Sequence, residues 1–491
     1  MGELRLTGLA SGMDTDFIIE QLMKAHRLKA TKIENKITTT EWKQEKWKEL
    51  NSKIYSFYTN QLSKLRFQSS FLTKKAVSSN QNKVEVTAGT NAADGTHIIK
   101  VKQLASAQFM TGDKINKANI SLSTKLTDLD IDASSNPTIT IKIGEQSTEF
   151  TIDENKTVGD FVNALKKAGL NANFDTVHNR FFISSKESGK ENEFTITSSN
   201  PEILEKLGLG SKASVVDAQD AEIVYNGVTL TSSSNNFTVN GLTLILKETT
   251  AVDEQISITV SNNTEAVYNM VKDFVKAYNE LITEFNKAYY ADSARGFDPL
   301  TDEEKEKMTD EQIAKWESKI KDALLRRDNT LGSLITTFRD ILSDPVSINE
   351  KKYSLSSFGI VTGDYSEKGL LHISGDSDFA SVALSENKLM DALNNNPDEV
   401  MQVLSKLASD LYNTLTEKMK STSLSSALTV YNDKELAKQI TDYKSELKRM
   451  EDRLSELEEK YYRQFSAMES ALAKMNSQSS FLMSMLGMNN N

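Results

Sequence analysis

The most constraining feature of this chain is a change of apolar periodicity along its length. Apolar residues recur three or four positions apart after Asp14 and again over 436–461, which is the spacing of amphipathic helices. Between Val84 and Val260 they alternate with polar residues, as strands do. Helices at both ends with strands between them indicate nested domains whose termini lie on one side. We therefore predict an α+β multidomain fold, in which terminal α-helical coiled-coil leg domains enclose nested β-rich head domains.

The C-terminal helix carries the pattern of a coiled coil. Its apolar positions alternate four and three residues apart and are flanked by Lys, Arg and Glu, as a coiled-coil seam requires. From Tyr461 the next apolar position, Phe465, is again four residues away, so the pattern contains a stutter that locally unwinds a supercoil. We predict that the seam changes partner or direction there, before a terminal assembly segment. The predicted seam consists of Leu436, Ile440, Tyr443, Leu447, Met450, Leu454, Leu457 and Tyr461.

The N-terminal helix has a recognisable start and an ambiguous middle. Asp14 is a plausible N-cap, and Asp16 lies in the first turn, where the helix dipole favours a carboxylate. The apolar stripe is interrupted at Lys29 and Thr40. One continuous helix and two helices with a joint near Lys29 both fit this pattern.

Two tight hairpins are predicted in the β-rich region. Asn226-Gly227 and Asn240-Gly241 each lie between alternating apolar runs. Type I′ turns need positive φ at both central residues, and Asn-Gly meets that need best. Each pair therefore predicts two antiparallel strands joined by a two-residue loop.

A smaller unit is predicted inside this region. Thr157 with Asp160 has the pattern of a helix N-cap with an acid at the third helical position, and Gly169 supplies a C-terminal stop. Alternating runs on both sides of this helix, at 138–143, 148–152, 172–177 and 180–184, complete a ββαββ unit.

These elements predict four nested domains. The outermost consists of the terminal helical segments, and inside it lie a helical leg, a β-rich head and an inserted head. Their expected bounds are 1–40 with 465–491, 41–75 with 263–464, 76–125 with 218–262, and 126–217.

Composition limits where this protein works and what it binds. A net charge of −11 argues against nucleic acid as a partner, because phosphate contacts need clustered Lys and Arg. Apolar runs of only a few residues predict no membrane insertion, and residues 1–13 lack the apolar core of a signal peptide. The absence of cysteine excludes disulfides, thiolate metal sites and a cysteine nucleophile.

No catalytic constellation emerges from the sequence. The four histidines are scattered without a ligand partner at metal-binding spacing, and a solitary histidine is most often structural or on the surface. Asp128, Asp130 and Asp132 begin like a calcium loop, but Ala133 replaces the required Gly and Ile139 replaces the bidentate Glu. We therefore predict a protein that is not an enzyme and has no catalytic, cofactor or metal site.

Apolar residues at both ends form the candidate functional surfaces. They pack on their own domain or on other subunits, and we expect the second because Met-rich surfaces adapt to several partners and large apolar patches rarely stay exposed. The N-terminal assembly interface is predicted to be Leu9, Met13, Phe17, Ile18 and Leu22. The C-terminal assembly interface is predicted to be Phe465, Met468, Leu472, Met475, Phe481, Leu482, Met485 and Leu486.

Several short motifs, in order along almost the whole chain, resemble those of the flagellar filament-cap family, FliD or hook-associated protein 2. They comprise an N-terminal signature, a central Phe-Val-x-x-Tyr-Asn, a Gly-Ile and Gly-x-Leu pair, an Asn-Pro-Asp segment and a C-terminal signature. In this chain they lie at 8–15, 274–279, 358–360 with 369–371, 389–400, and 465–482. The ββαββ unit is similar to a motif shared with flagellins. One departure is the run 26–29, which lacks the proline the family often has there, so the helix can continue.

The resemblance implies assembly rather than catalysis. It implies a homo-oligomeric ring, most often a pentamer, at the extracellular filament tip, reached through the flagellar type III apparatus without a cleaved signal peptide. The implied partners are flagellin, hook-filament junction proteins and an export chaperone at the C-terminal segment. Two alternatives stay open: a surface adhesin that binds host or matrix ligands through its head domains, and a flagellin-like filament subunit.

Overall fold

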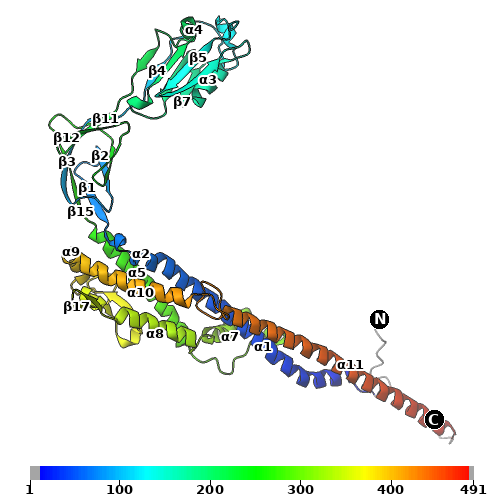
Figure 1. Cartoon of the computed structure of the whole chain (residues 1–491). Coiled ribbons are helices and arrows are strands. Elements are labelled where there is room, and N and C mark those ends of the chain that lie inside the picture. The colour runs from blue at the N-terminus through cyan, green and yellow to red at the C-terminus, as the bar shows by residue number, and fades with distance from the viewer. Residues whose placement is uncertain (1–11, 486–491) are drawn as a thin grey trace. The chain divides into compact units, whose positions relative to one another are not determined.

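A computed structural model describes residues 12–485, so the predicted interface residues Leu9 and Leu486 lie outside the described part. Two compact units emerge (Figure 1). The leg unit comprises 12–71 with 265–485, and the head unit comprises 72–264. These divisions fall within a few residues of the predicted leg-to-head boundaries, and the mixed helical and sheet architecture confirms the predicted fold class.

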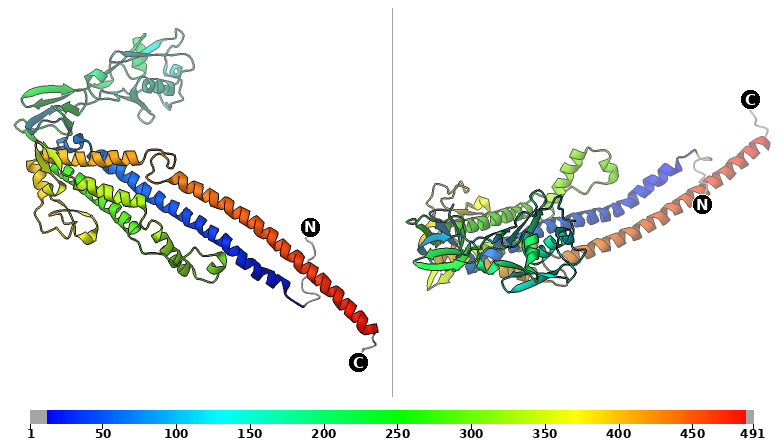
Figure 2. Two further views of the ribbon diagram at one scale, coloured as in Figure 1. Left: turned by 60° about the horizontal axis from the view of Figure 1, so that its bottom comes forward. Right: turned by 90° about the horizontal axis from the view of Figure 1, so that it is seen from above.

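Two long helices dominate the leg unit and lie side by side in opposite directions (Figures 1 and 2). Helix α1 (Thr15–Ser56) begins at Asp14, whose carboxylate accepts a hydrogen bond of 3.0 Å from the backbone N–H of Phe17. It passes Lys29 without interruption, so one continuous helix is the correct alternative. Helix α11 (Asp433–Met485) is also continuous.

The rest of the leg unit is a helical bundle with small hairpins. Helix α1 widens into a π-helix, η1, whose ends Phe57 and Leu62 are both buried. Three rings from two other helices surround Phe338, with centroids 6.0 Å away for Phe57 of η1, and 5.9 Å and 6.5 Å away for Phe285 and Tyr278, which share a helix. Such aromatic clusters supply much of a core's burial energy.

The remaining leg elements, which lie between α1 and α11 in the sequence, are helices of various lengths and two-stranded hairpins. They are η1 (Phe57–Leu62), α2 (Ser63–Leu65), η2 (Gln68–Phe71), α5 (Thr264–Tyr289), α6 (Asp302–Lys305), α7 (Asp310–Ala323), α8 (Asn329–Ser343), β16 (Val346–Ile348), β17 (Lys351–Tyr353), η5 (Leu355–Phe358), β18 (Ile360–Thr362), η6 (Tyr365–Glu367), β19 (Leu371–Ile373), α9 (Lys388–Asn395) and α10 (Pro397–Lys418).

The head unit contains two hydrophobic cores, each enclosed by sheets. The first core is formed by a five-stranded sheet in the order β1-β15-β3-β11-β12 and a three-stranded sheet in the order β13-β14-β2. All neighbouring strands in these sheets are antiparallel. The strands are β1 (Lys74–Ser78), β2 (Val84–Ala88), β3 (Gly95–Gln103), β11 (Ala221–Tyr225), β12 (Val228–Ser232), β13 (Asn236–Val239), β14 (Leu242–Leu246) and β15 (Ile256–Asn262).

Both predicted hairpins are confirmed. Strands β11 and β12 flank Asn226-Gly227, and β13 and β14 flank Asn240-Gly241. All four turn residues have positive φ, at 48° and 87° in the first turn and 49° and 76° in the second. These values are those a type I′ turn requires, which explains why Asn-Gly predicted the hairpins correctly.

The second core belongs to the inserted unit and contains the predicted ββαββ order. Its three-stranded sheet runs β6-β5-β9 and its four-stranded sheet runs β10-β4-β8-β7, with α3 packed on the core. The elements are β4 (Phe109–Thr111), η3 (Leu126–Leu129), β5 (Thr138–Ile143), β6 (Gln146–Thr151), α3 (Val158–Lys167), β7 (Leu170–Asp175), β8 (Arg180–Ser185), η4 (Lys190–Asn192), β9 (Phe194–Ser198), α4 (Pro201–Lys206) and β10 (Ser214–Val216).

The insert begins earlier than the expected residue 126. Strand β4 pairs with β8, and Ile115 and Ile120 are buried in the insert's core. The two connections to the rest of the head meet at an isolated bridge, where the N–H of Ser106 donates to the carbonyl of Gln219 at 2.9 Å. The expected start was wrong because a three-residue strand without an alternating run leaves little periodic signal.

The cap of α3 provides a local stability test. The hydroxyl of Thr157 accepts from the N–H of Asp160 at 3.1 Å, and the carboxylate of Asp160 accepts from the N–H of Thr157 at 3.0 Å. Thr157→Ala should destabilise α3 by about 1 kcal/mol, because it removes a capping acceptor. Hydrogen exchange of the α3 amides measures this loss, and Thr140→Ala on β5 of the same unit is the control. Unchanged α3 protection in Thr157→Ala would contradict the assignment.

Candidate assembly surfaces

Contacts between α1 and α11 define an antiparallel register. Arg27 lies 3.4 Å from Glu458, and Lys444 lies 2.7 Å from Glu41. Near the bundle, the side chain of Asn51 holds the loop before α11, donating to the carbonyl of Leu428 and accepting from the N–H of Val430, both at 3.0 Å. Exposed ion pairs contribute little stability. The two ion pairs therefore show which residues of α1 and α11 lie opposite each other, but they do not by themselves hold the helices in that register.

The predicted coiled-coil seam faces α1. Ile440 is buried and the other seven seam residues are half-buried, whereas most of the residues between them are exposed. The ammonium group of Lys36 lies 5.5 Å from the ring centroid of Tyr443, and the rings of His26 and Tyr461 lie 6.4 Å apart. In a pair of helices, the seam residues of α11 contact only one neighbouring helix, α1. This explains why most of these residues are half-buried rather than fully buried.

The α1 face that meets α11 differs from the predicted N-terminal interface. Ile19 and Met23 are 2% and 1% exposed, while Phe17 is 56% exposed. Met13 and Leu22 are also exposed, and Ile18 is half-buried. Ile19 and Met23, which follow Thr15 at a four-residue spacing, lie on this inward face, which is separate from the predicted assembly interface. Phe17 and Leu22 of the predicted set therefore keep large parts of their side chains exposed.

The C-terminal end of α11 extends beyond the start of α1 (Figures 1 and 2). Arg27 opposes Glu458, so Thr15, twelve residues earlier, opposes α11 twelve residues later. Accordingly Phe465, Met468 and Leu472 are half-buried, whereas every residue from 473 to 485 is exposed. We call 473–485 the overhang; its large apolar side chains are Met475, Phe481, Leu482, Met483 and Met485, between 56% and 73% exposed.

The predicted change of partner between Tyr461 and Phe465 is wrong within the described residues. Helix α11 stays regular across the stutter, and its seam remains half-buried for another two turns. The change occurs after Leu472, because the described part of α1 has no residues left to oppose α11. The N-terminal limit of the partner helix, rather than the stutter, determines where the seam opens.

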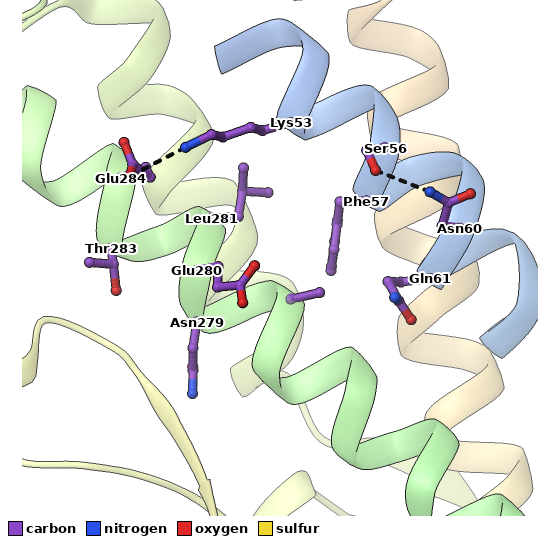
Figure 3. A pocket seen from close by; sticks show the side chains of 11 residues that line it. Lys53, Ser56, Phe57, Asn60, Gln61, Asn279, Glu280, Leu281, Thr283 and Glu284 are labelled. Atoms are coloured by element: carbon purple, nitrogen blue, oxygen red, sulfur yellow. Dashed lines mark hydrogen bonds and ion pairs between the residues drawn. The ribbon is translucent and has the colours of Figure 1, made fainter. Parts of the chain in front are cut away.

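A polar groove lies between α1 with η1 and α5, at the level of the bundle (Figure 3). Its volume is about 620 Å³, and it is open to solvent. Lys53 pairs with Glu284 at 3.3 Å across the groove, and the amide of Asn60 donates to the hydroxyl of Ser56 at 3.0 Å. The other lining residues are Phe57, Gln61, Ala277, Asn279, Glu280, Leu281 and Thr283. None belongs to the predicted assembly interfaces.

No candidate metal site is found among residues 12–485. This part of the chain contains no group of three His or carboxylate side chains that could hold an ion. In the segment that began like a calcium loop, Lys117 lies 2.8 Å from Asp130 and its hydrogen bond lowers the pKa of that carboxyl. Within the same residues, no helix is both long and apolar enough to cross a bilayer.

Sequence comparison places the chain in a family. The model of the flagellar hook-associated protein 2 C-terminus matches residues 218–477, more than half of the chain. The chain belongs to the flagellar hook-associated protein 2 family. The family's N-terminal model also matches, over residues 11–108.

Full-length relatives and a solved structure agree with this membership. Flagellar hook-associated protein 2 of Halalkalibacterium halodurans is 26% identical over 539 aligned residues, covering 97% of this chain and 98% of the relative. The Escherichia coli K12 protein of the same name is 25% identical, with both chains covered completely. The crystal structure of the D1-D2-D3 domains of the flagellar cap protein FliD from Escherichia coli has a TM-score of 0.54 and 22% identity, covering 75% of this chain and 95% of that one. That likeness supports the fold.

The central hook-associated protein 2 motif of this chain, at 274–279, has an architectural role in the leg. Phe274 and Tyr278 are buried in the bundle, and the Tyr278 hydroxyl donates to the carbonyl of Gly369 at 3.1 Å. Burial raises the pKa of Tyr278 to about 12. Asn279 brackets Leu371, donating to its carbonyl at 2.7 Å and accepting from its N–H at 2.8 Å. These residues hold the β18–β19 hairpin against α5.

Proposed function

We propose that this protein caps the flagellar filament. It forms a homo-oligomeric ring at the extracellular tip, retains flagellin that the type III apparatus exports, and promotes flagellin folding and polymerisation. Flagellin and the hook-filament junction proteins are its partners, an export chaperone covers the C-terminal segment before assembly, and five copies form the ring. The role is structural and non-catalytic.

The overhang is the observation that carries this proposal. It presents five large apolar side chains on a helix whose partner has ended, next to exposed Met13, Phe17 and Leu22 at the end of α1. A closed ring cannot meet every position of a helical filament equivalently. Its legs therefore need adaptable contacts, which flexible methionines supply.

Domain assignments follow from the same proposal. The terminal segments 1–40 and 465–491 act as the filament-facing part, and 41–75 with 263–464 forms the leg that supports the ring. The β-rich head at 76–125 with 218–262 and the insert form the plate, with the insert's start moved to follow Ser106. No part of this arrangement needs membrane insertion or nucleic acid.

Electron microscopy tests the cap proposal directly. Purified protein added to filaments from a strain that lacks its own cap should form closed rings of defined copy number, bound only at filament tips. Long helical polymers of the protein alone would instead indicate a flagellin-like subunit. Monomers that never bind tips would contradict both assignments.

An adhesive function of the insert is the second candidate. Phe109, Phe182 and Val216 are 52%, 43% and 58% exposed, and strand register places them together on the outer face of the β10-β4-β8-β7 sheet. Exposed apolar clusters of this kind mark binding sites. Replacing 107–218 with a short glycine linker across the Ser106–Gln219 bridge separates the functions. Intact filament growth with lost attachment to host or matrix ligands would assign adhesion to the insert.

A further inference from the structure

A long uncharged stretch in the head unit forms two sheet edges. Residues 223–246 contain no Asp, Glu, Lys, Arg or His, although 26% of the whole chain is Asp, Glu, Lys or Arg. The stretch supplies most of β11 and all of β12, β13 and β14. Strand β12 is an edge of the five-stranded sheet, and β13 is an edge of the three-stranded sheet.

Hairpin geometry determines which backbone groups these edges present. The pair next to a two-residue turn exchanges hydrogen bonds, and so does every second pair after it. Tyr225–Val228 and Val239–Leu242 are the turn-adjacent pairs. The N–H and C=O groups of Thr229 and Thr231 on β12, and of Thr238 on β13, therefore point away from their hairpin partners.

Side chains leave both edges accessible. Thr229, Thr231 and Thr238 are exposed, whereas Phe237 is buried and Leu230 packs on the head's own core. A strand that approaches either edge meets backbone groups and threonines. Recognition of this kind draws its affinity from main-chain hydrogen bonds, as in β-strand addition.

The other edge strands of the head unit have features that oppose pairing with another chain. Charged residues block pairing at β1, β2, β6 and β7, the edge strand β10 has only three residues, and α4 packs beside β9. The blocking charges are Lys74 and Lys75, Glu85, Glu149, and Asp175. Strands β12 and β13 have none of these protections, and an unprotected edge is a template for pairing with another chain.

We propose that edge β12 of one copy of this chain pairs with edge β13 of the next copy. The two edges belong to different sheets, so this contact is heterologous, and a heterologous contact repeats around a ring when its rotation closes. The inference rests on the proposed cap function and names the surface that joins the head units. A second copy is the fitting occupant, because each uncharged edge finds an equally uncharged strand there.

Cysteine pairs test which edges meet, because the natural chain contains no cysteine. Thr229→Cys and Thr238→Cys proteins are prepared separately, mixed under ring-forming conditions and treated with bis-maleimidoethane. A cross-linked dimer that appears only in the mixture supports the proposal. Cross-linking of Thr229→Cys alone would show that β12 meets β12, and absence of cross-links in every sample would also overturn it.

Lysine substitutions test whether the contact drives assembly. Thr231→Lys and Thr238→Lys should each lower the ring fraction in analytical ultracentrifugation by about tenfold, since a lysine on an edge strand opposes pairing with another strand. Thr243→Lys is the matched control, because Thr243 is exposed on β14 but that strand has neighbours on both sides. Wild-type ring fractions in both edge variants would overturn the proposal.

Two outcomes distinguish failure of this contact from failure of the proposed cap function. Rings of the wild-type protein at filament tips, together with absence of the cross-link, would contradict the β12–β13 contact and leave the cap function intact. A cross-link without rings at filament tips would contradict the cap function alone.

Discussion

Removing residues 465–491 is expected to abolish filament elongation while leaving the head unit and the leg bundle folded. The truncation deletes the overhang and the last half-buried seam residues, but it leaves the bundle core untouched. Filament length on cells that carry the truncated gene measures function, and circular dichroism of the purified protein measures folding. Filaments of normal length would contradict the assigned role of the C-terminal segment.

A finer variant separates the overhang from the helix that carries it. Phe481→Gln, Leu482→Gln and Met485→Gln together remove exposed apolar surface while keeping a good helix former at each position. We expect loss of tip binding with unchanged stability. The matched control is Ser477→Gln, Ser479→Gln and Ser480→Gln, which places the same residue type at three exposed positions of the same helix. Equal tip binding by both variants would show that the apolar side chains are dispensable.

Asp376→Ala should destabilise the leg unit by about 3 kcal/mol, because it removes a buried carboxylate that two donors share and leaves the Tyr268 hydroxyl without its acceptor. Asp376 is 5% exposed, accepts from Lys272 at 2.8 Å and accepts from the Tyr268 hydroxyl. The lost carboxylate also holds the loop before α9, through the N–H of Asp378 at 2.9 Å. Denaturant unfolding followed by tryptophan fluorescence measures the loss, because all three tryptophans lie in the leg unit.

The same cluster gives a pH dependence with a definite sign. Burial raises the pKa of Asp376, but the hydrogen bonds from Lys272 and Tyr268 together lower this pKa by more than burial raises it. The net shift of this pKa is therefore downward. Hydrogen bonds from Lys276 and Lys272 lower the pKa of Asp378 to about 2. A carboxylate whose pKa falls on folding stabilises the protein above its unfolded pKa, about 3.9, and this stabilisation disappears as pH falls through the folded pKa. We expect the leg to weaken between about pH 4 and pH 2.

Asp378→Ala is the matched control for this cluster. Asp378 pairs with Lys272 at 2.9 Å and Lys276 at 2.6 Å, but its side chain is 42% exposed. Water can replace its contacts, so its removal should cost much less than that of Asp376. Equal losses in the two variants would show that burial does not distinguish these carboxylates.

Local chemistry made much of the fold predictable. The caps at Asp14 and Thr157 and both Asn-Gly turns are set by residues within a few positions of each other. The seam of α11 was predictable for the same reason, because a heptad repeat is a local pattern. The apolar terminal segments also pointed to assembly, although which of their residues bind other subunits remains a prediction.

Long-range packing decided the rest. The sequence by itself determined the helical ends, the β-rich middle, the helix caps and the Asn-Gly hairpins, because periodicity and turn chemistry act over a few residues. Only the tertiary structure showed that Ile19 and Met23 face α11, that β4 belongs to the insert, and that the seam opens after Leu472. Each of these depends on the register between segments far apart in the chain. The apolar pattern of a helix or strand does not show where the partner segment begins or ends. The overhang and the two unprotected edges could therefore be identified only from the pairing of segments in the tertiary structure.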